Sequence, residues 1–412
     1  MFTLNLMTED PTKAVVCPVS RVSAMSFFIF LCILLHIPDF SAARKNILFL
    51  AADDMRPNLG CYDDVNSPVF TTPGMITPNL DKLAKQSILF QNAYVQQALC
   101  SPSRTSLLTS RRPDTTHITE IGPYFRDIGG NFTTIPQFFK ENGYRTIGGG
   151  KIFHGGSASG HDDQDYSWSE KYHHAPNYYP DNKTKVWRAI SEEATANKPL
   201  KDTAEADYII ERMRELAPAA LLGEENFFLA YGVHKPHMPW FFPERFLEIY
   251  PEDLINLPLN PYVPEGMPEM AWSPPPIKKY DDCSADSLGV PNFGDFNLTA
   301  PDWKVLELRR AYYAAVSYAD HELGRVLDEL NELGLAENTI IVFWGDHGWQ
   351  LGEHAEWAKQ TTFEIANRVP FMIRVPGMTD DGIKTDKLVE MVPNTGGCYR
   401  VSFLRHLHRN VQ

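Results

Sequence analysis

Short apolar runs alternate with amphipathic stretches along most of this 412-residue chain. The apolar runs end at turn-forming or acidic residues, which is typical of strands buried on both faces of a parallel sheet. The runs that predict strands are 45–51, 144–150, 226–232 and 338–345.

Helix signals occupy the segments between these runs. Thr77 followed by Pro78 supplies an N-cap and a first-turn proline, while Pro136 and Gly143 mark the start and end of another helix. Apolar residues recur at helical spacing farther along the chain, and Gly334 ends the longest pattern. The stretches that predict helices are 77–86, 134–142, 204–217 and 302–333.

Alternating strands and helices predict an α/β fold, with a mainly parallel central sheet flanked by helices. Residues 236–300 are rich in proline and lack a regular period, so they predict a long surface excursion rather than a second domain. In α/β sheets, functional sites lie beyond the carboxyl ends of the strands. The residues that follow each strand are therefore the first candidates for functional residues.

The two ends of the chain depart from this pattern. The apolar run 25–37 is too short for a stable membrane span, and small residues follow it up to Ala43. We interpret 25–43 as a secretory signal peptide rather than an uncleaved anchor, because no strongly basic segment follows. Residues 1–24 form a leader of uncertain status, 44–392 the folded domain, and 393–412 a basic tail without an apolar period.

Charge and composition narrow the possible partners and the compartment. A net charge of −14 argues against a nucleic-acid partner. Protonation of all 13 histidines would bring the chain close to neutrality, which fits either an acidic compartment or a merely histidine-rich surface. Glycosylation sequons at Asn131, Asn182 and Asn297 favour secretion, and the few cysteines exclude a disulfide framework.

Two predicted strands end in possible metal ligands. Asp53 and Asp54 follow the first strand, and Asp346 and His347 follow the last. Three carboxylates brought together resist ionisation unless a cation lies among them, so calcium or magnesium is the natural partner. The imidazole of His347 is a softer ligand and leaves the metal open. Alternatively, the first two aspartates only cap a turn.

A cysteine lies at the predicted start of a helix. Pro102 suits a first turn, which places Cys100 where free backbone N–H groups and the helix dipole lower a thiol pKa. Arg104 follows one turn later and can reach an anion bound at the same place. The pattern predicts an anion site with a nucleophile, unless Cys100 is half of a disulfide.

These residues also carry a family resemblance. The sequence CSPSR, at 100–104, resembles the Cys-x-Pro-x-Arg signature of the formylglycine-dependent type I sulfatases, whose fold is alkaline-phosphatase-like. The resemblance covers about 46–392 except 175–200, although Ser110 stands where the family usually has glycine. The other segments that carry it are LAADDMRPNLGCY, RRPDTT, NFTTIPQFFKENGYRTIGGGKIFH, GVHKPHMPW, AYYAAVSYAD and DHGWQLGEHAEWAKQ.

The resemblance implies that 44–392 is a sulfatase catalytic domain in which Cys100 is a precursor. In the family, a formylglycine-generating enzyme oxidises this cysteine in the endoplasmic reticulum. One hydroxyl of the hydrated aldehyde attacks sulfur, and the other expels sulfate after losing its proton. The resemblance also implies one calcium ion per chain. Its ligands would be Asp53, Asp54, Asp346, His347 and the formylglycine oxygen at Cys100.

Further catalytic roles follow from the same resemblance. Arg104 would steady the formylglycine, and Lys151 and His154 would hold the nucleophile and the sulfate oxygens. His154 is the candidate base for the second hydroxyl. His234 and Lys359 would flank the leaving oxygen, where one protonates it and the lysine offsets the charge of sulfate or of a uronate carboxylate.

Two aromatic side chains near these motifs have weaker assignments. Trp349 either stacks on a substrate sugar ring or belongs to the core. His237 receives no role in this interpretation.

Within the family, the motifs are most similar to those of enzymes that act on 2-O-sulfated iduronate in heparan and dermatan sulfate. This implies a sulfated glycosaminoglycan substrate and delivery to the lysosome by the secretory pathway, or secretion. We expect no stable membrane span. Alternatives are a folded but inactive chain that binds sulfated glycans, and a metal-dependent phosphate-ester hydrolase, which would usually have threonine or serine at position 100.

The likeness stops after Val392. The family continues with a C-terminal subdomain that helps to cover the sheet and shape the substrate pocket, where this chain has the 393–412 tail. We therefore expect exposed apolar surface and reduced activity if this tail replaces the subdomain.

Overall fold

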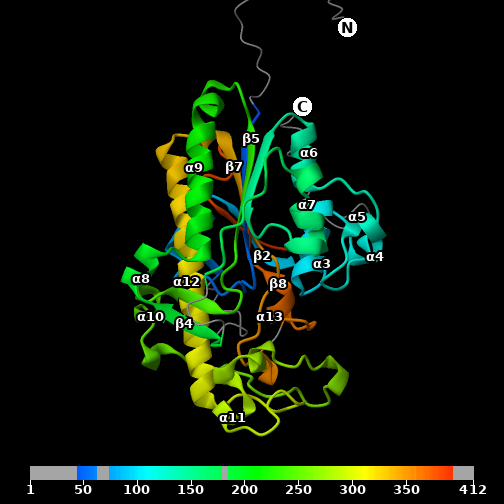
Figure 1. Cartoon of the computed structure of the whole chain (residues 1–412), viewed down its shortest axis with the longest axis vertical. Helices are drawn as coiled ribbons and strands as arrows, with labels where there is room; N and C mark the ends of the chain where they lie inside the picture. The colour runs from blue at the N-terminus through cyan, green and yellow to red at the C-terminus, as the bar shows by residue number, and fades with distance from the viewer. Residues whose placement is uncertain (1–43, 63–73, 179–183, 358, 393–412) are drawn as a thin grey trace, which may run out of the picture. The chain divides into compact units, whose positions relative to one another are not determined.

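A mixed eight-stranded sheet forms the centre of the fold (Figure 1). The computed structural model describes residues 44–62, 74–178, 184–357 and 359–392. The strand order is β10-β2-β9-β7-β1-β5-β3, and β8 also pairs with β2. The strands are β1 (Asn46–Ala52), β2 (Ile88–Tyr94), β3 (Arg145–Gly150), β5 (Phe227–Val233), β7 (Thr339–Gly345), β8 (Arg368–Val369), β9 (Phe371–Arg374) and β10 (Ile383–Glu390).

The four strands predicted from apolar runs are β1, β3, β5 and β7. They are consecutive neighbours in the sheet, and every pairing among them is parallel. Every residue of β1, β5 and β7 is buried, which explains why these strands lack polar alternation. The predicted α/β class is confirmed, while β9 runs antiparallel to β7 and β2 and makes the sheet mixed.

Helices cover both faces of the sheet (Figure 1). Alternate residues of β1 belong to different core clusters. Leu48 and Leu50 pack with the α9 and α12 side, whereas Ile47 and Phe49 pack with residues of α3 and α6. The helices are α2 (Pro78–Ala84), α3 (Cys100–Thr109), α4 (Pro113–Thr116), α5 (Phe125–Ile128), α6 (Ile135–Glu141), α7 (Gly160–Ser167), α8 (Glu192–Asn197), α9 (Lys201–Leu222), α10 (Arg245–Glu248), α11 (Ala285–Leu288), α12 (Asp302–Glu332) and α13 (Glu364–Asn367).

Local sequence signals account for several helix boundaries. Thr134 caps α6 with a complete capping box, in which its side chain accepts from Gln137 N–H and the Gln137 side chain accepts from Thr134 N–H. The predicted helix at 302–333 is α12, and Gly334 follows it with a φ of 72°, a conformation that favours glycine. None of the helices in the described ranges is long and apolar enough to cross a membrane.

Residues 236–300 belong to the same compact unit as the sheet, as predicted. They lie less on the surface than predicted. Strand β6 (Trp240–Pro243) pairs with β4 (Trp187–Ile190) in a second, two-stranded parallel sheet. Trp240 and Ile277 of this region are fully buried in the core cluster that contains α12. The predicted leader, signal peptide and tail lie outside the described residues.

Candidate active site

The carboxyl ends of β1 and β7 bring four predicted ligands together. The two strands are parallel and in register, with Ala52 opposite Gly345, so the residues that follow them are neighbours. Asp346 N–H donates to Ala52 C=O at 3.1 Å, and Asp54 N–H donates to the Asp346 Oδ1 atom at 3.1 Å. Adjacent parallel strands therefore place Asp53, Asp54, Asp346 and His347 in one site.

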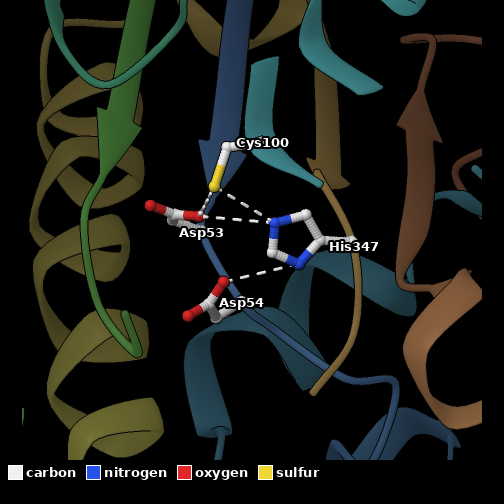
Figure 2. A group of neighbouring side chains, drawn as sticks. All are labelled: Asp53, Asp54, Cys100 and His347. Carbon is white, nitrogen blue, oxygen red and sulfur yellow. Dashed lines mark hydrogen bonds and ion pairs between the residues drawn. The ribbon is translucent and has the colours of Figure 1, made fainter. Parts of the chain in front are cut away.

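Cys100 is the first residue of α3, and its side chain faces Asp53 and His347 (Figure 2). Its Sγ atom lies 3.5 Å from Asp53 Oδ1 and 3.3 Å from His347 Nε2. The thiol belongs to a free cysteine and is only 1% exposed. The sequence predicts this thiol just ahead of a helix N-terminus and near the acidic strand ends; the structure places it beside those strand ends, within the first turn of the helix.

Three basic side chains surround the carboxylates. Arg104 Nε donates to Asp346 Oδ2 at 2.8 Å, and Lys151 Nζ forms an ion pair with Asp53. Lys359 Nζ lies 2.6 Å from Asp54 Oδ1 and 3.1 Å from Cys100 Sγ. Because the carboxylates are buried, each needs such a partner to stay ionised.

The basic groups determine the charge state of the nucleophile position. Burial alone would raise the pKa of the Cys100 thiol, and Asp53 adds to this. Lys151, Lys359 and His347 outweigh both effects and hold the pKa well below its ordinary value. The site therefore stabilises negative charge at residue 100, which is what a nucleophile for an anionic ester needs.

Asp53, Asp346 and His347 each have a strongly shifted pKa. Burial opposes ionisation of Asp53, but Lys151, His237 and Arg104 hold its pKa well below the ordinary value. Burial raises the pKa of Asp346 to about 7, although Arg104 opposes this. Burial would lower the pKa of His347, yet Asp346 raises it to about 9. Near neutral pH, and without a cation, His347 is therefore protonated and Asp346 is partly protonated.

The donor set fits a hard divalent cation. One ligand atom from each of Asp53, Asp54, Cys100 and His347 lies within 4.8 Å of the others. Asp54 Oδ2 is buried and has no hydrogen-bond partner in the described part of the chain, so it is free to bind a cation. An oxygen at residue 100 would complete an oxygen-rich set typical of calcium.

A cavity of about 540 Å³ opens beside the cluster. Asp53 and Lys151 line it from the active-site side, and His234 and His237 line it from the segment after β5. Three further lysines in its wall were missed by the sequence analysis: Lys201, Lys235 and Lys279. Their surroundings are set by tertiary packing, and no local pattern separates them from surface lysines.

His237 is also a residue that the sequence analysis left without a role. Burial lowers its pKa to about 4, although the nearby Asp54 and Asp53 carboxylates attract a proton. Its Nδ1 lies 2.6 Å from the Met238 carbonyl oxygen. The sequence signal for His237 was its place beside His234 in the segment HKPH. In the structure both histidines line the cavity.

Other predicted site residues lie outside the immediate cluster. His154 is half-buried, and its Nδ1 has no hydrogen-bond partner among the described residues. Trp349 is 1% exposed and packs in the core, with the Lys359 Nζ atom 5.8 Å from its ring centre, which favours the core alternative.

Two of the three predicted glycosylation asparagines lie in the described ranges. Asn131 and Asn297 are exposed, and Asn131 Oδ1 accepts a hydrogen bond from Arg126. Asn182 lies outside the described residues.

The fold and the site together define a class. An α/β sheet that gathers a cation-binding acidic cluster and an activated nucleophile position at its carboxyl edge is an active-site architecture for hydrolysis of anionic esters. The sulfatase family model matches residues 45–392, and the chain belongs to the sulfatase family.

Curated relatives share substantial sequence identity. The chain is 43% identical over 350 residues to iduronate 2-sulfatase of Mus musculus and 42% identical over 348 residues to that of Homo sapiens. Each match covers 81% of this chain and 60% of the relative, so the chain spans about three fifths of their length.

Solved structures share the fold at lower identity. Phosphonate monoester hydrolase of Agrobacterium radiobacter has a TM-score of 0.61 at 20% identity, covering 85% of this chain and 72% of that one. A 2-O GAG sulfatase has a TM-score of 0.55 at 19% identity, covering 88% of this chain and 70% of that one. Both likenesses support the α/β fold.

Proposed function

We propose that the chain hydrolyses sulfate esters and removes 2-O-sulfate from iduronate residues of heparan sulfate and dermatan sulfate. The observation that carries the proposal is residue 100, buried between Lys151, Lys359 and His347 so that negative charge is stabilised on its side chain. Sequence identity of 42–43% to two iduronate 2-sulfatases supports the finer choice of substrate.

The residues of the chain divide into a sulfate side and a leaving-group side. Lys151 and Lys359 bring positive charge to the nucleophile position, where the sulfur atom would lie, and Arg104 fixes Asp346. His154 would accept a proton on the sulfate side. His234 lines the cavity where the sugar would lie and would donate a proton to the leaving oxygen.

Two groups implied by the family would complete this site. Formylglycine at Cys100 would supply a hydrated aldehyde as nucleophile, and calcium held by Asp53, Asp54, Asp346 and His347 would polarise the sulfate. The buried oxygen of Asp54 without a partner supports the presence of a cation. The formylglycine-generating enzyme would then be a partner during maturation.

The proposal is tested on protein secreted from animal cells. Peptide mass spectrometry across Cys100 should find formylglycine, and the protein should release sulfate from a fluorogenic iduronide 2-sulfate. Asp53→Ala and Asp346→Ala should each lose turnover and bound calcium. An unmodified cysteine and no turnover, with retained binding to heparan sulfate, would replace the proposal with that of an inactive glycan-binding chain.

We also propose a lysosomal location, reached through the secretory pathway. The histidine content and the exposed sequon asparagines Asn131 and Asn297 support it. Co-localisation with a lysosomal marker and an acidic activity optimum are the expected results. An optimum well above neutral pH would contradict this location.

A further inference from the structure

A second buried acidic cluster surrounds His234 in the wall of the cavity. Asp202 and Glu205 lie on the first turns of α9, and His234 follows directly after β5. His234 Nδ1 lies 3.1 Å from Glu205 Oε2 and 3.3 Å from Asp202 Oδ1. Both carboxylates are essentially fully buried, so two negative charges face one imidazole nitrogen.

The two carboxylates make different contacts. Asp202 accepts the backbone N–H groups of His234 at 2.6 Å and of Lys235 at 3.2 Å, so it also fixes the chain after β5. Glu205 Oε1 accepts from Ala175 N–H at 3.3 Å. Glu205 Oε2 completes no hydrogen bond to the described residues, so the ion pair with His234 is its main interaction. A buried carboxylate oxygen of this kind favours a proton on the facing nitrogen.

This contact orients the imidazole ring. The Nδ1 atom is buried against the carboxylates, whereas the side chain keeps 22% exposure and lines the cavity. The ring edge that carries Nε2 therefore faces the cavity. Burial would lower the pKa of His234, but Glu205 and Asp202 together raise it above its ordinary value. His237 lies three residues farther along the chain in the same wall and forms no ion pair with a carboxylate of the described residues, and burial lowers its pKa.

We propose that Glu205 and Asp202 are positioning residues that hold His234 doubly protonated, with Nε2–H directed at the leaving oxygen of the substrate. This inference rests on the proposed sulfatase function. As the bond between sulfur and the sugar oxygen breaks, its electron pair stays on that oxygen, which takes the Nε2 proton. The nucleophile at residue 100 forms the new bond to sulfur, and solvent in the cavity reprotonates the neutral imidazole.

Other charged groups lie near His234. Lys201 and Lys235 line the same cavity, and Lys201 Nζ lies 3.8 Å from Glu205 Oε1. Burial disfavours the protonated form of His234, while the two carboxylates favour it. The charged and titratable groups around the cavity are Lys201, Asp202 and Glu205 of α9, Lys235 and His237 after β5, Lys151 after β3, Asp53 after β1, and His174, Tyr178, Lys279, Tyr280 and Tyr318. Glu205 is the cleanest site for a test because its contact with His234 does not involve the backbone of His234.

The first test measures the imidazole itself and needs no turnover. The proton resonances of His234, assigned with His234→Gln, are titrated by NMR in the full chain and in Glu205→Gln. We expect a lower pKa for His234 in Glu205→Gln, because one of the two facing negative charges is removed. Glu211→Gln, at an exposed position of the same helix, is the matched control. An unchanged titration of His234 would overturn the proposal.

The second test compares leaving groups. An aryl sulfate has a good leaving group, whereas an iduronide 2-sulfate releases an alkoxide that needs a proton. Glu205→Gln should lower the iduronide-to-aryl ratio of kcat by at least about tenfold, because general-acid catalysis contributes roughly 10²–10⁴-fold. The double variant with His234→Gln should show no larger drop in this ratio than His234→Gln alone.

The outcomes separate this inference from the proposed function. Equal losses on both substrates, or multiplicative losses in the double variant, would show a merely structural role for Glu205. A second bound metal ion that disappears in Glu205→Gln would instead make the cluster a metal site. If the wild type contains formylglycine but releases no sulfate, the proposed function is contradicted. The NMR titration would still show whether Glu205 favours the protonated form of His234.

Discussion

The two buried acidic clusters that reach the cavity differ in how their charges are balanced. At the active-site cluster (Asp53, Asp54, Cys100, Asp346 and His347), the balancing side chains Arg104, Lys151 and Lys359 come from separate parts of the chain. At the histidine cluster (Asp202, Glu205 and His234), two carboxylates face a single imidazole. The first arrangement stabilises negative charge at residue 100, and the second favours a protonated imidazole.

The largest expected effect comes from the nucleophile of the active-site cluster. Cys100→Ala should lower turnover of the iduronide 2-sulfate by at least roughly 10³-fold, because it removes the residue that we propose as the nucleophile. The thermal midpoint should change little, because the Cys100 side chain contacts polar side chains and belongs to neither apolar core cluster. Steady-state kinetics and thermal unfolding of the same preparation measure both quantities.

Cys283→Ala is the matched control for this prediction. Cys283 is also a free, fully buried cysteine, but it packs in the core away from the cluster, and burial raises the pKa of its thiol. This variant should lose stability and keep its activity per folded molecule. Comparable turnover in the two variants would mean that residue 100 is not the nucleophile.

The second prediction removes a balancing charge from the active-site cluster. Arg104 is fully buried and donates to Asp346, so Arg104→Met leaves uncompensated carboxylates in the interior. The expected loss is about 3–5 kcal/mol of unfolding free energy, which is typical when one partner of a buried ion pair is removed. Denaturant unfolding measures this loss.

An exposed ion pair provides the comparison for Arg104. Arg112 pairs with Glu390 at 2.6 Å, but both side chains are 40% exposed or more, so Arg112→Met should cost only about 0–1 kcal/mol. Similar losses for the two variants would show that the cluster does not depend on Arg104 for charge balance.

The third prediction concerns calcium and pH. The Asp346 pKa of about 7 and the His347 pKa of about 9 mean that both groups carry protons in the mildly acidic range without a cation. Calcium must displace these protons, so its affinity should rise with pH between about 6 and 8, by up to roughly tenfold per pH unit for each proton released. Calorimetry in two buffers of different ionisation enthalpy counts the protons.

Asp346→Asn tests which group releases the proton. The variant should release fewer protons than the wild type on binding calcium, because the amide does not titrate and because loss of the Asp346 charge also lowers the pKa of His347. An affinity that is flat from pH 6 to 8 in the wild type would contradict the titration assigned to this cluster.

Continuous burial explains which strands were predictable from the sequence. Strands β1, β5 and β7 are buried along their whole length, so their apolar runs stand out. Strand β10 is mostly exposed and pairs with β2, which is distant in the sequence, so no local pattern indicates it. Its place in the sheet is decided by tertiary pairing.

The same distinction applies to the two clusters. Asp53 and Asp346 follow predictable strands, and Cys100 has a distinctive surrounding sequence. Glu205 lies in an amphipathic stretch in which a glutamate is ordinary, and only the packing of α9 against the end of β5 brings it to His234. Cluster residues that depend on helix-to-strand packing therefore need the structure.

The smallest expected effect separates the two histidines of the cavity wall. His237 has a pKa of about 4, because burial outweighs the attraction of Asp54 and Asp53, so it is mostly neutral above about pH 5. His234 has a raised pKa and loses its proton only at higher pH.

His237→Gln should lower kcat/KM by about tenfold or less and leave the alkaline limb of the pH profile in place, whereas His234→Gln should abolish that limb. Profiles of kcat/KM from pH 4 to 9 distinguish the variants. If His237→Gln moved the limb and His234→Gln did not, the proton donor would be His237, and the charge contrast between the two clusters would not explain the acid in this site.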